Sequence, residues 1–406
     1  MCRFPWVGIT IMPEGRIVPC CGAPSVTLGH LSEHTSLDQQ IQSDSQGLLR
    51  DSFERGEWPA ACVGCRQNRE AGRPALIDYM ADRFLPWSEE DYRAGRPRVR
   101  YLEVTASRAC NATCATCGSR FSSAWAREDR AARSEGLTWR DSDQEFRVQP
   151  EHREITPAQW ARVEEAMSTV DYLMLKGGEP LMDHRNLGLL ERLLRLGRSP
   201  TISIITNFAR VTEQTLDLLA RFPRLNLSVS IDAVGDLYEW IRSTEWQTTR
   251  ENLSRWHSRT GRRVTVLTTV SLYNYTRLEE TVRECLALPA VQQVNLLMVH
   301  RPLYTSAAMI LPDRLRLLQK EHLSSLWIGN NPRVERSEIA TRMPSALELN
   351  PIEFHRNRDR VPQWIEFLDR RRSRPLLTVH PELEPILTEI AESRHQPPVA
   401  AHNQKW

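Results

Sequence analysis

Apolar residues follow two alternating patterns through the middle of the chain. Short runs rich in β-branched residues have the period of two typical of strands, and the stretches between them have the spacing of amphipathic helices. The six predicted strands are Val99–Thr105, Tyr172–Leu175, Thr201–Ile205, Leu225–Ile231, Val264–Val270 and Val294–Val299. The predicted helices are Phe121–Ala132, Leu187–Leu196, Glu213–Arg221, Leu237–Trp256 and Leu278–Leu288. This alternation predicts an α/β fold with a parallel sheet or a partial (β/α)6 barrel.

Different patterns flank this region. The segment Ile9–Val18 has two apolar runs around a Pro-Glu-Gly turn, which predicts a β-hairpin, and Leu48–Arg55 predicts a short helix. After Arg301 the apolar spacing becomes helical. The helix-like segments there are Pro312–Leu326, Ser337–Leu347 and Pro351–Arg371.

These patterns predict how the chain is divided. We expect a small cysteine-rich hairpin and helix module over residues 1–70, a linker over 71–97 and the barrel core over 98–301. A helical region is expected over 302–394 and a tail over 395–406. A length of 406 residues is compatible with two or three domains.

The charge balance and the absence of long apolar stretches exclude several classes of protein. The chain has 53 Lys and Arg against 51 Asp and Glu, which gives a formal net charge of +2. This balance argues against a protein held to nucleic acid mainly by counterion release. No stretch approaches the roughly 20 apolar residues that span a bilayer. The first residues lack the basic-then-apolar layout of a secretory signal, so we expect a cytoplasmic protein without membrane contact.

The cysteines point to metal or cluster binding. Nine cysteines are an odd number for a disulfide scaffold, and clustered thiols in a reducing compartment favour metal ligation. Cys110, Cys114 and Cys117 have the spacing C-x3-C-x2-C. A structural zinc site takes four ligands, whereas three thiolates leave one iron of a [4Fe–4S] cluster open for a non-protein ligand. A zinc site completed by a distant residue is the alternative at this point.

A glycine-rich turn follows the second predicted core strand. The run Gly177-Gly178-Glu179-Pro180 comes directly after the apolar residues of that strand. Two glycines allow the backbone to approach a ligand closely, and a Glu carboxylate can accept hydrogen bonds from an ammonium group. An ordinary strand-to-helix turn is the alternative for this run alone. Both the cysteines and this turn follow strands, and the loops after barrel strands carry the chemistry.

On these motifs the segment from about Arg98 to Arg301 resembles the core of the radical S-adenosylmethionine (SAM) enzymes. The resemblance implies that the three cysteines hold a [4Fe–4S] cluster whose open iron is chelated by SAM. It also implies SAM contacts from the glycine turn and from the ends of the third and fourth strands. These residues are Gly177, Gly178, Glu179, Asn207, Ser230, Asp232 and Arg242. Thr116 departs from the family, where an aromatic residue usually precedes the third cysteine, near adenine.

The cysteines near the N-terminus form a second candidate site. Cys2, Cys20, Cys62 and Cys65 could hold zinc tetrahedrally or one [4Fe–4S] cluster, and their sulfurs would have to converge on one site. Their layout, a hairpin leading to Gly-x4-Cys and a closing C-x2-C, resembles the SPASM/twitch modules of radical SAM enzymes. The resemblance implies an auxiliary [4Fe–4S] cluster, here in a module that precedes the core. Cys21 could replace Cys20, although neighbouring strand residues point to opposite faces.

The resemblance implies an enzyme that cleaves SAM reductively to a 5′-deoxyadenosyl radical and abstracts a hydrogen atom from a peptide or a small molecule. Full ligation by four cysteines favours an auxiliary cluster that accepts an electron over one that binds substrate. The expected cofactors are the two clusters and SAM, and the expected redox partner is a reductant such as flavodoxin or ferredoxin. The alternatives are a radical SAM enzyme that modifies RNA and a non-catalytic zinc-binding interaction protein.

The ends of the last two core strands are expected at the barrel opening. They lie near Ser271–Tyr275 and near His300–Arg301. Their position after strands places them on the rim that carries the cysteine loop. Tyr273 and Tyr275 either face a substrate there or pack the loop.

Overall fold

A computed structural model describes residues 2–70, 72, 75, 76, 78, 97–142, 154–336, 339 and 351–393. The chain divides into two compact units. The first comprises residues 1–111, 119–124 and 147–228, and the second comprises 112–118, 125–146 and 229–406. Most of the predicted linker 71–97, most of the predicted helix Ser337–Leu347 and the tail 395–406 lie outside the described residues.

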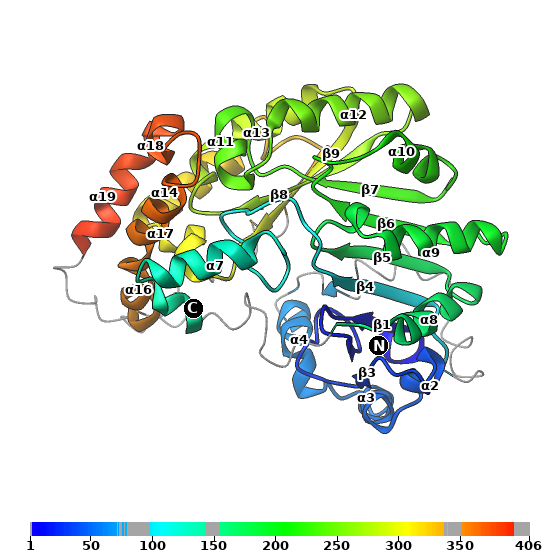
Figure 1. The fold of residues 1–406 in the computed structure, drawn as a ribbon. Coiled ribbons are helices and arrows are strands. Elements are labelled where there is room, and N and C mark those ends of the chain that lie inside the picture. Colours follow the sequence, from blue (N-terminus) through cyan, green and yellow to red (C-terminus); the bar gives the residue numbers. More distant parts are fainter. Residues whose placement is uncertain are drawn as a thin grey trace. The chain divides into compact units, whose positions relative to one another are not determined.

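The first unit is built around a sheet with the strand order β7-β6-β5-β4-β1-β2-β3 (Figure 1). Strands β1, β4, β5 and β6 are parallel neighbours, and β2 and β3 add antiparallel pairs at one edge. The strands are β1 (Gly8–Ile11), β2 (Arg16–Val18), β3 (Gly29–His30), β4 (Tyr101–Ser107), β5 (Tyr172–Gly177), β6 (Thr201–Thr206) and β7 (Leu225–Ser230). The helices are α1 (Phe4–Val7), α2 (Leu37–Ile41), α3 (Asp44–Glu54), α4 (Val63–Glu70), α8 (Pro157–Glu165), α9 (His184–Arg195) and α10 (Glu213–Ala220).

The predicted N-terminal hairpin is present and joins the sheet of the core. Strands β1 and β2 pair antiparallel, and Gly15 supplies a positive φ of 75° in the turn between them. Strand β1 then pairs in parallel with β4, with Thr10 opposite Glu103. The sequence predicted the hairpin but not this pairing, because strand partners that lie far apart in the chain leave no local pattern.

The second unit contains three parallel strands and most of the C-terminal helices. The strands are β8 (Val264–Val270), β9 (Val291–Met298) and β10 (Val334–Glu335). The helices are α7 (Trp125–Ser134), α11 (Gly235–Arg242), α12 (Trp246–Thr260), α13 (Leu278–Ala287), α14 (Pro312–Ser324), α16 (Pro351–Arg358), α17 (Arg360–Asp369), α18 (Leu376–Val379) and α19 (Glu384–Glu392). Parallel strands that alternate with helices confirm the α/β fold class.

Two predicted helices are wrong in their extent, and one of them, Pro351–Arg371, is divided at Asp359 into α16 and α17. The segment Leu237–Trp256 forms two helices, α11 and α12, rather than one. Ser243 ends α11 because it adopts a left-handed conformation with φ of 54°. Few non-glycine residues adopt this conformation, so the apolar spacing gave no sign of the break.

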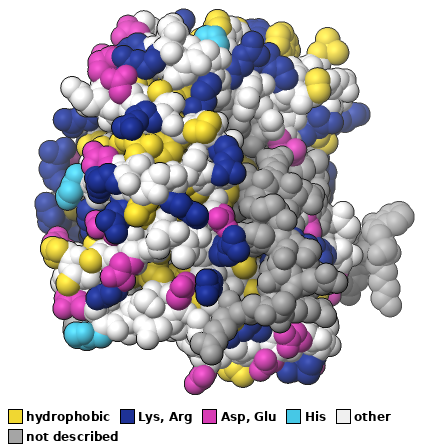
Figure 2. All heavy atoms as spheres, turned by 90° about the vertical axis from the view of Figure 1, so that its right-hand side faces the viewer, with side chains coloured by type: hydrophobic (Ala, Val, Ile, Leu, Met, Phe, Trp, Pro, Cys, Tyr) yellow, Lys and Arg dark blue, Asp and Glu magenta, His cyan; other side chains and the backbone are white. Residues whose placement is uncertain are grey.

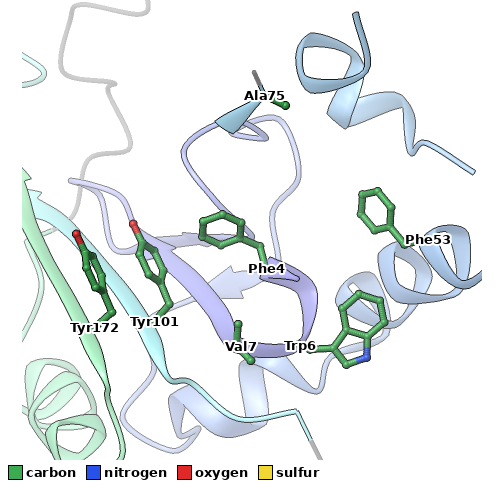
Figure 3. Close-up of a cluster of buried hydrophobic side chains, with 7 residues drawn as sticks. All are labelled: Phe4, Trp6, Val7, Phe53, Ala75, Tyr101 and Tyr172. Carbon is green, nitrogen blue, oxygen red and sulfur yellow. The ribbon is translucent and has the colours of Figure 1, made fainter. Parts of the chain in front are cut away.

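A cluster of buried aromatic and aliphatic side chains connects the N-terminal helices to the core strands (Figure 3). Tyr101 of β4 stacks on Tyr172 of β5 with ring centroids 5.1 Å apart, and Phe4 of α1 meets Tyr101 edge-on at 5.0 Å. Such ring pairs add about 0.5–1.5 kcal/mol beyond the area they bury. The cluster consists of Phe4, Trp6, Val7, Phe53, Ala75, Tyr101 and Tyr172.

The surface carries charges of both signs. On the face shown in Figure 2, Lys and Arg side chains are interspersed with Asp and Glu side chains. This mixture agrees with the small formal net charge of +2. Among the described residues, no helix combines the length and the apolar character needed to cross a bilayer.

Replacing Tyr101 with Ala tests the importance of the aromatic cluster. Tyr101 is 1% exposed and touches both Phe4 and Tyr172, so we expect a loss of about 3–5 kcal/mol in the free energy of unfolding. Denaturant unfolding measures this loss. Leu48→Ala is the control, because Leu48 is 68% exposed and its truncation should stay within about 0.5 kcal/mol. Equal effects of the two substitutions would contradict the role given to the cluster.

Candidate active site

The glycine turn after β5 lies against the backbone that leads into the cysteine loop. Gly177 has a positive φ of 121°, which side-chain-bearing residues rarely adopt. A Cβ atom on Gly178 would lie 2.5 Å from the Ala109 carbonyl oxygen and 2.9 Å from the Arg108 carbonyl carbon. The Glu179 amide donates to the same Ala109 oxygen at 2.6 Å. Both glycines are therefore needed for the turn to approach the residues just before Cys110.

Glu179 connects this turn to the end of the next strand. Its side chain is fully buried, and its carboxylate accepts hydrogen bonds from the Thr206 hydroxyl and the Asn207 amide, both at 2.6 Å. The Asn207 side chain in turn donates to the Asn111 side chain at 3.0 Å. The first unit thus brings Glu179 and Asn207 together beside the start of the cysteine loop, as expected for the ends of neighbouring parallel strands.

The second unit contains the rest of the loop, residues 112–118, with Cys114 and Cys117. This segment has no helix or strand, so its backbone polar groups need other partners. Four of its carbonyl groups accept hydrogen bonds from side chains of the same unit. The donors are Arg372 to Thr113 (2.6 Å), Trp125 to Cys114 (3.1 Å), Trp364 to Ala115 (3.0 Å) and Arg140 to Cys117 (3.1 Å).

The C-terminal end of α11 supplies further partners to this loop. The Ala115 amide donates to the Ile241 carbonyl at 2.7 Å, and the Thr113 amide donates to the Ser243 hydroxyl at 2.6 Å. The left-handed conformation that ends α11 therefore coincides with the residue that binds the loop. Sequence reasoning missed Ser243 and the four side-chain donors, because no local pattern shows which backbone group a side chain will meet.

Asp232 and Arg242 form an ion pair beside Cys114 in the second unit. The Arg242 guanidinium donates to the Asp232 carboxylate at 2.8 Å, and the Thr269 amide of β8 donates to the same carboxylate at 2.8 Å. Burial raises the pKa of the Cys114 thiol, while the positive charges of Arg242 and Arg372 act in the opposite direction. Ser230, the last residue of β7, is only partly buried.

The loop after β8 packs inside the second unit. Tyr273 and Tyr275 have no exposed surface, and Tyr273 lies edge-on to Trp240 at 5.0 Å. The Asn274 side chain donates to the Asp232 carbonyl at 2.6 Å. This geometry favours the packing role for both tyrosines, whereas His300 and Arg301 after β9 are exposed.

The four N-terminal cysteines of the first unit line one small cavity. Its wall consists of Cys2, Cys20, Cys62 and Cys65 together with Phe4, Gly22, Ala23, Phe53, Trp58 and Leu76. Burial raises the pKa of Cys2 to about 12 and of Cys62 to about 11, and the neighbouring thiols increase both further. Among the described residues, no three Cys, His, Asp or Glu side chains are grouped as a single metal ion requires. The four thiols of this predicted site thus share one wall with apolar side chains.

Cys21 belongs to a different group of side chains. Desolvation of its thiol and the nearby Glu103 carboxylate raise the pKa of the thiol to about 11, although the residue as a whole is exposed. Glu103 is 1% exposed and also binds the Lys176 ammonium at 2.8 Å. Adjacent cysteines therefore have different surroundings, and only Cys20 lies in the cavity wall.

Residues 104–285 match the family model described as the Radical SAM superfamily. These residues are a radical SAM domain. The match includes the three-cysteine loop and the glycine turn, so it confirms the recognition made from those motifs. Radical SAM domains are catalytic, so the match agrees with the expectation of an enzyme. No curated protein matches the chain.

Several solved structures resemble the chain that carries this radical SAM domain. SuiB of Streptococcus suis, bound to precursor peptide SuiA, aligns over 73% of this chain and 62% of SuiB, with 12% identity and a TM-score of 0.39. The anSMEcpe structure with AdoMet and the Cp18Cys peptide aligns over 57% of this chain and 61% of that chain, with 14% identity and a TM-score of 0.38. A radical SAM methyltransferase from Sphaerobacter thermophilus aligns over 35% of this chain and 45% of its own, with 24% identity and a TM-score of 0.26. This chain spans less than two thirds of SuiB. The radical SAM domain is identified by the family match and not by these structural alignments.

Replacing Gly178 with Ala tests the close approach of the turn. The new Cβ would meet the backbone of Arg108 and Ala109, which cannot rotate away, so we expect a cost of about 1–3 kcal/mol in the free energy of unfolding. Gly188→Ala in α9 is the matched control. Nothing lies within 4 Å of a Cβ at Gly188, so that variant should be unchanged or more stable by up to about 1 kcal/mol. Denaturant unfolding distinguishes the two, and equal stabilities would contradict the close contact.

Proposed function

We propose that this chain cleaves SAM to a 5′-deoxyadenosyl radical and abstracts a hydrogen atom from a peptide or small-molecule substrate. Bound [4Fe–4S] clusters would supply the electron chemistry, one by donating an electron to SAM and an auxiliary one by accepting an electron from the substrate radical. The observation that carries the proposal is the family match over residues 104–285, which includes the three-cysteine loop and the glycine turn. A small electron-transfer protein such as flavodoxin or ferredoxin would provide the reducing electron.

In this proposal different residues bind the cluster and SAM. Cys110, Cys114 and Cys117 would hold the first cluster. Glu179 and Asn207 would position SAM from the first unit, where they already lie beside the start of the cysteine loop. Arg242 would meet the SAM carboxylate, since a guanidinium fork suits a carboxylate, and Asp232 already orients it. Gly177, Gly178 and Ser230 would contribute backbone or hydroxyl contacts.

The N-terminal cavity would hold the auxiliary cluster. Cys2, Cys20, Cys62 and Cys65 are its thiols, and the rest of its wall is apolar, which excludes water from the bound group. Four available thiols support full ligation and hence electron transfer rather than substrate binding at an open iron. Their raised pKa values mean that ligand binding must displace protons, so loading of this site should weaken as the pH falls.

Iron content and SAM cleavage test the first cluster. Protein reconstituted without oxygen should contain about eight irons, and the Cys110→Ala, Cys114→Ala, Cys117→Ala triple variant about four. With dithionite the parent should release 5′-deoxyadenosine, and Cys114→Ala should release none. Cys285→Ala is the control, because Cys285 is a fully buried residue of α13 and its loss should leave the iron content unchanged. Cleavage of SAM by Cys114→Ala at the parent rate would refute the proposal.

A second pair of variants tests the auxiliary site. Cys20→Ala removes a thiol from the cavity wall, whereas Cys21→Ala removes one that faces Glu103. We expect iron to fall toward about four per chain in Cys20→Ala and to stay near about eight in Cys21→Ala. Metal analysis of the anaerobically purified proteins measures this difference. If the parent protein contained about four irons together with bound zinc, the N-terminal cysteines would form a zinc site and the auxiliary cluster would be refuted.

A further inference from the structure

Arg372 binds both the cysteine loop and α11. It follows α17 and donates to the Thr113 carbonyl at 2.6 Å, the Thr113 hydroxyl at 3.2 Å and the Trp240 carbonyl at 2.7 Å. Thr113 directly precedes Cys114, and Trp240 lies in α11, whose end also binds the loop. One planar guanidinium therefore fixes the loop and α11 together, a geometry that the single ammonium of lysine cannot reproduce.

Trp364 and Arg140 hold the next part of the loop from the same side. Trp364 of α17 donates from its indole to the Ala115 carbonyl at 3.0 Å and stacks on Trp125 of α7 at 5.4 Å. Arg140 lies over the Trp364 ring at 4.3 Å and donates to the Cys117 carbonyl at 3.1 Å. Figure 1 shows α7 and α17 side by side, although more than 200 residues separate them in the chain.

The three guanidinium groups near Cys114 and Cys117 differ in how their charge is balanced. Arg140 donates to the Asp129 carboxylate at 2.7 Å and Arg242 to the Asp232 carboxylate at 2.8 Å. Arg372 donates only to neutral oxygens among the described residues. Burial lowers its pKa to about 10, so it still carries its charge at neutral pH. Arg372 is therefore the cation whose field on the loop is least compensated by a directly bound carboxylate.

We propose that Arg372, Trp364 and Arg140 form a clamp that holds the cysteine loop in its binding conformation, and that the charge of Arg372 raises the reduction potential of the group bound there. This inference rests on the proposed function, in which that group is a [4Fe–4S] cluster. A reduced cluster carries one more negative charge than an oxidised one, and a fixed positive charge nearby stabilises the more negative state. The C-terminal helical region thus takes part in electron transfer to the site through positioning residues.

Three variants of Arg372 and its neighbours separate charge from geometry. Arg372→Met removes both the charge and the hydrogen bonds, and Arg372→Lys keeps the charge but not the fork. Trp364→Phe removes one neutral hydrogen bond to Ala115 and keeps an aromatic ring. Arg370→Met is the matched control, because Arg370 is an exposed cation two residues away that pairs with Glu135 and Glu366.

The potential of the SAM-site cluster is measured by redox titration followed by electron paramagnetic resonance, in chains that carry Cys20→Ala so that this cluster is observed alone. We expect Arg372→Met to lower the midpoint potential and to slow 5′-deoxyadenosine release with dithionite. Arg372→Lys and Trp364→Phe should keep potentials near the parent value, and so should Arg370→Met. An unchanged potential in Arg372→Met, or an equal drop in Arg370→Met, would overturn the charge effect.

Amide hydrogen exchange of residues 112–118 in the iron-free protein tests the clamp without any cluster. Exchange in this segment should be at least tenfold faster in Arg372→Met, Arg372→Lys and Trp364→Phe than in the parent or in Arg370→Met. Exchange at the parent rate in the first three variants would overturn the clamp. If the parent itself bound no cluster and cleaved no SAM, the proposed function would fail, whereas this exchange result would still report on the loop.

Discussion

The conformation of the three-cysteine loop depends on hydrogen bonds that come mostly from other parts of the fold. Residues 112–118 form neither helix nor strand, and the peptide groups there are satisfied almost entirely from outside. Unpaired peptide groups in a buried position cost about 1–3 kcal/mol each, so the surrounding structure is organised to meet them. Side chains of α7 and α17 and the end of α11 all converge on this one short segment.

The N-terminal cavity also brings together thiols that must be held in place by the surrounding structure. Its thiols come from three separate places in the chain, namely the start, the end of the hairpin and the short stretch that contains Cys62 and Cys65. Aromatic side chains help to hold these places together, with Phe4 and Phe53 in both the cavity wall and the buried cluster (Figure 3). An apolar wall is suited to a group that exchanges electrons, because its low polarity influences the potential.

Much of the fold could be predicted from the sequence, because regular elements leave local patterns. Strand β8 has the predicted bounds, Val264–Val270, since its residues alternate cleanly between buried and half-buried. The cysteine spacing and the glycine turn likewise predicted the radical SAM domain, because the residues of each motif are close together in the chain. Contacts between segments that are distant in the chain produce no local pattern in the sequence. The pairing of β1 with β4 and the hydrogen bonds from Arg372 to the loop could therefore be found only in the structure.

The difference between Cys20 and Cys21 shows the same limit on a smaller scale. Both cysteines follow β2 rather than belonging to it, so the strand alternation expected from the sequence does not explain why their side chains diverge. In the folded chain one thiol joins the apolar cavity and the other meets an ion pair on β4 and β5. The identity of a neighbour depends on the whole fold.

The parallel pairing of β1 with β4 determines which truncated forms of this protein keep the edge of the core sheet paired. A chain shortened to begin near Arg98 would lose β1, and β4 would become an unpaired edge strand of the sheet. The unpaired amide and carbonyl groups of an edge strand can pair with strands of other molecules. The Tyr101 ring would also lose its edge-on contact with Phe4 and become exposed. The N-terminal segment therefore covers one edge of the core sheet, quite apart from any metal that its cysteines bind, and its removal should favour self-association.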